Sequence, residues 1–442
     1  MSAIASGGPG WVRPGEWLRK PVVATVAVGV FVAVVAFLRL SPVARATIWA
    51  EDGAVFIARA AEPALLTRWI FTPYDGYTHA LPQLIGIVAW NFVPISFIAI
   101  AVTAACCAVV GAVAAGVFSL TARWGLNIPG RLFLAAITVL VPDLTFEVLG
   151  NLANLHWFLL WLTPFVLLTR PRTWGGAVGL GVLVFAIATS EIQSFVFAPL
   201  LLWHLRDRLR WPMVAGMLAA GVLQGMAVLG GSRDRGSRPS LSSIIDGYFL
   251  QVPLTGFAGT GQGASALVAH SGWLIAYAAA VPFAICGLWY AGRSRRRAAV
   301  VALFVGASGV LWIAGFAINY DDSWNYAHMD PGALAAGIAQ LRYAVVPTMF
   351  LFTLIGLAVG GDRASRHRLA PAASGALIVA ACTLIASFHV ANGASRPGGP
   401  TWAHGIQAAR VTCQDPAITR AEVPIAPAPW TVGLSCDLLA RR

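Results

Sequence analysis

Residues 21–40 read PVVATVAVGVFVAVVAFLRL, an apolar run whose only charged residue is Arg39. A helix rises about 1.5 Å per residue, so about twenty apolar residues cross the roughly 30 Å hydrocarbon core of a bilayer. Basic residues precede the run, as in a secretory signal peptide, but it is longer than a typical signal-peptide core and lacks a clear Ala-x-Ala exit. We therefore predict a retained membrane helix.

The rest of the chain extends this reading. Of its 442 residues, 58% are hydrophobic and only 11% are charged, with a mean hydropathy of +0.73, which is too apolar for a soluble core. Further apolar stretches, some short or interrupted by polar residues, fall near 95–119, 131–145, 155–169, 176–189, 193–205, 212–230, 272–290, 298–318, 343–360 and 371–391. We predict an all-α polytopic membrane protein with about eleven transmembrane helices.

The distribution of charge predicts the orientation. Short cytoplasmic loops are enriched in Lys and Arg. With residues 1–20 on the cytoplasmic side, the inner segments carry more than half of the 30 basic residues and only Glu16, Asp207 and Asp362 of the 18 acids. The net charge of +12 is then mostly a topology signal. No soluble basic face with aromatic platforms is visible, so we expect no nucleic-acid partner.

Three parts follow from this topology. A cytoplasmic N-terminus spans 1–20, a transmembrane domain spans 21–391, and an odd number of helices places a tail, 392–442, outside the cell. Cys413 and Cys436 are the only cysteines outside apolar stretches. In an oxidising compartment we expect them to form a disulfide, which would stabilise the tail by about 3 kcal/mol.

Two outer segments have a distinctive composition. Residues 41–94 place apolar side chains at helical spacing between prolines, which predicts short helices lying along the outer membrane interface. Residues 230–263 are rich in Gly, Ser and Arg, so we predict a mobile loop that covers a substrate.

Carboxylates gather near the outer helix ends. Glu51 and Asp52 follow the first apolar run, where a carboxylate can accept a proton near the bilayer surface; the alternative is a solvated turn. Glu147 and Glu191 stand beside polar breaks in neighbouring spans. Because an unpaired carboxylate is costly there, we predict that both line one wet, outward-facing cavity.

Several cations are candidate phosphate ligands. Arg342 is the strongest, since a guanidinium binds phosphate oxygens bidentately. Membrane snorkelling, or a salt bridge to one of three nearby acids, is the equal alternative; these acids are Asp321, Asp322 and Asp330. Arg59 is weaker, because it can simply face lipid headgroups. His79 and His156 can donate to phosphate or sugar oxygens, although a lone His near a helix end is more often structural.

The acids at 321, 322 and 330, with His328 nearby, also raise the possibility of a divalent cation. Loop acids are commonly just solvated, and no Cys/His spacing indicates zinc. We therefore predict no metal and no certain cofactor.

The acidic pair and three short stretches carry a resemblance to a known family. The stretches are residues 73–79 (PYDGYTH), 150–157 (GNLANLHW) and 340–343 (QLRY). In these features the chain resembles bacterial membrane glycosyltransferases of the GT-C superfamily, which use polyprenyl-phosphate-linked sugars. The resemblance implies an active-site acid in the first outer loop, often the catalytic base, and that role falls on Glu51 or Asp52. Many members have a large outer C-terminal domain that is not found here, so the analogy does not extend to the acceptor.

We therefore expect a glycosyltransferase of the bacterial inner membrane, transferring a sugar from a polyprenyl phosphate to a glycan, lipid or protein on the outer side. Such chemistry needs a base for the acceptor hydroxyl and cations for the departing phosphate. The expected substrate-binding residues are Arg342, His79, His156, Tyr74, Tyr77, Glu147, Asn151, Asn154, Glu191 and Arg59. A transporter or flippase of a lipid-linked sugar, or a noncatalytic scaffold, remains the alternative, although a transporter typically shows two related halves with charges at mid-membrane depth.

Overall fold

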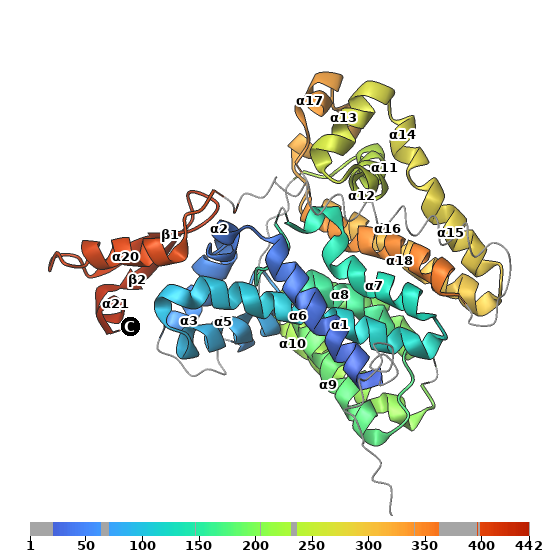
Figure 1. Ribbon diagram of the computed structural model, residues 1–442, viewed down its shortest axis with the longest axis horizontal. Coiled ribbons are helices and arrows are strands. Elements are labelled where there is room, and N and C mark those ends of the chain that lie inside the picture. Colours follow the sequence, from blue (N-terminus) through green and yellow to red (C-terminus); the bar gives the residue numbers. More distant parts are fainter. Residues whose placement is uncertain are drawn as a thin grey trace, which may run out of the picture.

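The computed structural model describes residues 21–62, 70–145, 147–203, 205–230, 237–339, 341–361, 396 and 398–441. The predicted cytoplasmic segment 1–20, the predicted span at 371–391 and Gln340 lie outside these residues. The described chain is mainly helical, with one two-stranded sheet near the C-terminus (Figure 1).

Six helical segments of the described chain are long and apolar enough to cross a membrane. They are Pro21–Arg39 (α1), Ile95–Trp124 (containing α6, Ile98–Thr121), Arg208–Leu229 (containing α10, Trp211–Leu229), Leu274–Ala291 (α14, Leu274–Ala278, and α15, Val281–Ala291), Arg295–Ile318 (α16) and Arg342–Gly360 (containing α18, Val345–Gly360). Shorter apolar helices are Ala80–Phe92 (α5), Ile128–Leu140 (α7), His156–Leu167 (α8), Trp174–Ser190 (α9) and the 3₁₀ segment Ile192–Leu201. A membrane protein is thus indicated, but the count of about eleven spans is not confirmed.

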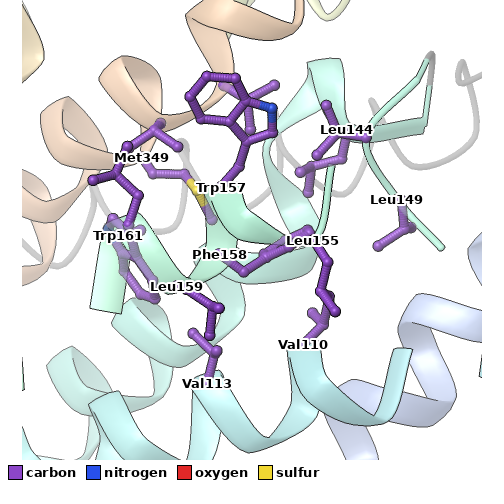
Figure 2. Close-up of a cluster of buried hydrophobic side chains, with 14 of the residues drawn as sticks. Val110, Val113, Leu144, Leu149, Leu155, Trp157, Phe158, Leu159, Trp161 and Met349 are labelled. Carbon is purple, nitrogen blue, oxygen red and sulfur yellow. The ribbon is translucent and has the colours of Figure 1, made fainter. Parts of the chain in front are cut away.

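Helix α8 lies at the centre of the bundle. Every one of its residues is buried, as expected for a helix that is apolar on all sides. Figure 2 shows Trp157, Phe158 and Trp161 of α8 in a cluster with Met349 of α18 and Val113 of α6. Because this helix is held from several directions, its N-terminal residue His156 has a fixed position.

Helix α1 differs from α8, because one face of α1 is exposed. α1 packs against α6 where Gly29 faces Gly111, and a Cβ atom on Gly111 would come within 2.3 Å of the Gly29 carbonyl oxygen. Two glycines therefore allow the two backbones to approach closely. The other face of α1 exposes Val22, Phe31 and Leu38, as a lipid-facing surface would.

The predictions for residues 41–94 and for residues 230–263 have different outcomes. Residues 41–62 and 70–94 form short helices, as predicted: α2 (Pro42–Arg45), the π-helical turn Asp52–Ile57, α3 (Ala58–Ala61) and α5. The predicted mobile loop at 230–263 is wrong for residues 241–263, because α11 (Leu241–Phe249), a π-helical turn (Leu250–Leu254), α12 (Thr255–Ala258) and the start of α13 (Gly261–Ser271) form there.

Capping and packing explain that error. Ser240 and Thr260 cap α11 and α13 by accepting hydrogen bonds from backbone N–H groups. Gly247 packs against the ring of Tyr326, where a Cβ atom would lie only 2.6 Å from the nearest ring atom. The small residues here allow close packing, which composition alone cannot distinguish from flexibility. Helix α17 (Pro331–Ala336) packs against α13 beside them.

The tail forms a small folded unit of α20 (Trp402–Thr412), β1 (Arg420–Pro424), β2 (Thr431–Ser435) and α21 (Cys436–Arg441). The strands are antiparallel, with Arg420 opposite Ser435. The predicted disulfide between Cys413 and Cys436 is confirmed, and it joins the end of α20 to the start of α21.

This C-terminal unit docks on the first outer segment, beside α2 and α3 in Figure 1. The backbone N–H of Trp402 donates to the carbonyl of Ala46 (2.8 Å), and its indole donates to the carbonyl of Ile95 (2.7 Å). Trp49 forms a β-bridge with Ala426, which places the unit next to the acidic pair.

Candidate functional site

Asp52 begins the π-helical turn and is 2% exposed. Its two carboxylate oxygens accept hydrogen bonds from the backbone N–H groups of Leu152 and Ala153, each at 2.8 Å. Burial raises the pKa of Asp52 to about 7, although these two N–H groups and the Arg396 guanidinium act in the opposite direction. Asp52 therefore fastens the turn before α8 to the first outer segment.

Arg396 supports the same turn and was missed by the sequence reasoning. Its buried guanidinium donates to the carbonyls of Leu149 (2.8 Å), Gly150 (3.3 Å) and Ala44 (2.8 Å). It lies near the start of the predicted tail, 392–442, and nothing in its local sequence marks it as buried. Asp52 and Arg396 thus hold residues 149–153 from two sides.

Glu51 has a different environment from its neighbour. It is partly exposed, and its carboxylate accepts a hydrogen bond from the hydroxyl of Tyr74. Burial, together with the negative charge of Glu51, raises the pKa of Tyr74, so this hydroxyl remains a neutral donor. Arg342 interacts electrostatically with both groups.

A tight turn presents Tyr74. Tyr74 and Tyr77 exchange two backbone hydrogen bonds of 2.7 and 3.1 Å, and the two residues between them, Asp75 and Gly76, have φ of 51° and 82°. Such a pair of left-handed residues is typical of a type I′ turn. The Arg59 guanidinium donates to the carbonyl of Pro73 (3.1 Å), so Arg59 supports this turn.

Arg342 forms an ion pair with Glu147, with side-chain exposures of 33% and 16%. It also donates to the hydroxyl of Tyr343 at 3.2 Å. The alternative ion-pair partners have other contacts: Asp321 bonds Ser323 (2.9 Å to its N–H), Asp322 accepts from the Ser237 hydroxyl (2.7 Å), and Asp330 caps α17. Within the described residues, no three His, Cys, Asp or Glu side chains are grouped as a metal site would require.

Asn151 and Asn154 shape the turn that carries Glu147. Their side-chain amides both donate to the Glu147 carbonyl, and Asn154 in turn accepts from the indole of Trp157 at 3.1 Å. Both asparagines are buried. The structure therefore gives them local partners and places Glu147 towards Arg342.

A second polar group lies behind this turn. Nδ1 of His156 contacts the carboxylate of Glu191, and both side chains are buried. The structure therefore gives Glu191 a local partner, and its place in a wet, outward-facing cavity stays a prediction. His79 packs edge-on against His156 at a ring separation of 4.9 Å, and its Nε2 lies 2.8 Å from the Tyr77 hydroxyl. Burial keeps the pKa of His79 well below its usual value, so the imidazole is neutral.

The candidate site is thus Glu51, Tyr74, Arg342 and Glu147, with Asp52 and Arg396 beneath it. Four separate segments supply a partly exposed carboxylate, a phenol donor, a guanidinium and a second carboxylate. A carboxylate beside a cation can accept a proton while the cation stabilises an anion formed nearby. Comparisons with protein-family models, with curated proteins and with solved structures give no match for this chain.

Proposed function

We propose that this chain is an integral membrane glycosyltransferase that moves a sugar from a polyprenyl phosphate to a glycan, lipid or protein acceptor on the outer side of the bacterial inner membrane. The observation that supports the proposal best is the electrostatic interaction of Glu51 with Arg342, two residues that most of the membrane domain separates in the sequence. Proton acceptor and phosphate-binding cation are the two groups that this transfer requires.

In the proposed reaction, the bond between the anomeric carbon and the donor phosphate oxygen breaks, and a new bond forms from that carbon to the acceptor hydroxyl oxygen. Glu51 takes the hydroxyl proton as the oxocarbenium-like centre develops. Arg342, oriented by Glu147, stabilises the polyprenyl phosphate that leaves. The Tyr74 hydroxyl holds the Glu51 carboxylate in place.

We assign the base to Glu51 because Asp52 is buried and both of its oxygens already accept backbone hydrogen bonds. Asp52 is instead a positioning residue. It fixes the turn at 150–154, and through that turn the orientation of Glu147 and Arg342.

The test is turnover of the full chain in lipid nanodiscs with a panel of polyprenyl-phosphate sugars. We expect Glu51→Gln to reduce sugar transfer by about 10²–10⁴-fold, the usual contribution of a general base, with donor affinity little changed. Glu62→Gln, at an exposed carboxylate of the same outer segment that has no place in the candidate site, is the matched control and should retain most of the activity.

Equal activity of Glu51→Gln and wild type would remove Glu51 from the chemistry. No transfer from any donor, together with movement of lipid-linked sugar across liposomes that survives the substitution, would replace the transferase with a flippase.

A further inference from the structure

A cavity of about 660 Å³ lies at the end of the helices opposite the candidate site. Five arginines line it: Arg123, Arg170, Arg210, Arg296 and Arg297. They stand just after α6, just after α8, just before α10 and in the first turn of α16. The turn before α8 is held by Asp52 of the candidate site, so residues beyond the far end of α8 belong to the other membrane surface, which the charge distribution predicts to be cytoplasmic.

The charge in this cavity is strongly positive. No acidic residue is among the described residues that line it. Arg170 pairs with the neighbouring Asp207 (2.7 Å), which leaves a surplus of positive charge. The Ser294-capped N-terminus of α16 adds its partial positive charge.

One of these arginines is also incompletely satisfied. Arg210 is 2% exposed, and its Nη2 donates to the carbonyl of Leu167 at 2.6 Å. Its Nε is buried without a hydrogen-bond partner among the described residues. This unsatisfied N–H leaves the Arg210 guanidinium incompletely compensated, so negative charge in the adjoining cavity would be favoured.

Apolar and aromatic side chains form most of the rest of the cavity wall. They include Trp124, Leu168, Trp203, Tyr290 and Leu303. Trp203 and the nearby Trp211 are more than half exposed, as expected for side chains at headgroup depth. A free phosphate would contact only the arginines, whereas a lipid would also pack against this apolar wall.

We propose that this cavity binds the phosphate headgroup of an anionic membrane lipid. The arginines bind the phosphate oxygens, and the apolar wall packs against the glycerol and the first acyl carbons. Basic pockets between helices on the cytoplasmic side of membrane proteins suit such headgroups. This site shares no residue with the candidate site and does not depend on the proposed activity.

The test is native mass spectrometry of the full chain in an uncharged detergent, titrated with phosphatidylglycerol, phosphatidylcholine or glycerol phosphate. Arg123 and Arg296 are exposed, so the double variant R123Q/R296Q should fold. We expect it to weaken phosphatidylglycerol binding about thirtyfold, which corresponds to about 2 kcal/mol for two charges. The control R208Q/R295Q removes two exposed charges from the same end that do not line the cavity, and should change affinity by less than about threefold.

Ala299→Trp provides a second test without a change in charge. Ala299 is exposed on α16 and lines the cavity, so the indole should occupy the space and displace the lipid. Equal weakening by both double variants, or unchanged binding in Ala299→Trp, would overturn the site. Glycerol phosphate binding as tightly as phosphatidylglycerol would overturn the lipid as its ligand.

Discussion

At the scale of single residues, Glu51 and Asp52 are adjacent in sequence and opposite in environment. The sequence identified the pair but could not assign the roles, because Asp52 is buried by Leu152 and Ala153, one hundred residues further along the chain. Tyr74, Glu147 and Arg342 were also predicted; Tyr74 and Arg342 interact with Glu51, and Glu147 forms an ion pair with Arg342. Asn151, Asn154, Glu191 and Arg59 were predicted as substrate ligands, and their described contacts give them local partners.

The environment of Asp52 predicts a pH dependence of stability. Its pKa is about 7 in the folded chain and 3.8 as the ordinary value, so the folded state holds the proton more tightly than the unfolded state. Its contribution to the free energy of unfolding is therefore fully present below about pH 4. That contribution falls by at most about 4 kcal/mol as the pH rises towards 7. The substitution Asp52→Asn should remove this part of the pH dependence of the free energy of unfolding.

Thermal unfolding of the wild type and Asp52→Asn in nanodiscs between pH 4 and pH 8 measures the effect. The difference between the two curves isolates Asp52 from other carboxylates that titrate in this range. Parallel curves would show that the Asp52 carboxyl has an ordinary pKa.

At the scale of elements, helix periodicity and turn chemistry were predictable where local sequence decides them. Most apolar runs in the described residues became helices, and the helices described within 41–62 and 70–94 are short, as predicted. Local sequence failed at 241–263, where packing against Tyr326 and Phe352 decides the structure. It also gave no indication of Arg396, whose partners lie up to 352 residues away.

The turn before α8 predicts a sharp requirement for glycine. Gly150 has a φ of 75°, and an added Cβ would lie 2.5 Å from buried Leu40 and 3.2 Å from Thr103. We expect Gly150→Ala to lower the free energy of unfolding by about 2–3 kcal/mol, from the left-handed backbone and overpacking together. Gly76→Ala is the matched control: its φ is 82° with nothing within 4 Å, so only about 1 kcal/mol should be lost. Thermal unfolding of both variants tests this, and equal losses would show that the space around Gly150 is unimportant.

At the scale of the whole molecule, the C-terminal unit and the first outer segment form one structure. Ala50, directly before the acidic pair, has a φ of 24°, and its N–H donates to the carbonyl of Ala426 at 2.5 Å. A left-handed non-glycine residue persists only where its surroundings fix it. Here the residue that fixes the backbone of Ala50 is Ala426, which belongs to the C-terminal unit.

The disulfide should therefore stabilise the acidic pair at a distance. We expect Cys413→Ala/Cys436→Ala to lower the opening free energy of the C-terminal unit by about 2–4 kcal/mol, and to speed amide exchange at Ala50, with the membrane helices unchanged. Hydrogen exchange with mass spectrometry measures both. Cys286→Ala, at a free thiol in α15, is the control. Faster exchange in the unit without any change at Ala50 would contradict the coupling.

The buried Arg396 has a consequence for biosynthesis. The carbonyls of Ala44 and Leu149 leave the ribosome long before the guanidinium that satisfies them, because Arg396 follows Ala44 by 352 residues. The junction can therefore close only after most of the helices have been synthesised. Arg396 closes it among the last steps of synthesis, so a chain that stops short of residue 396 would lack the guanidinium that joins Ala44 to Leu149.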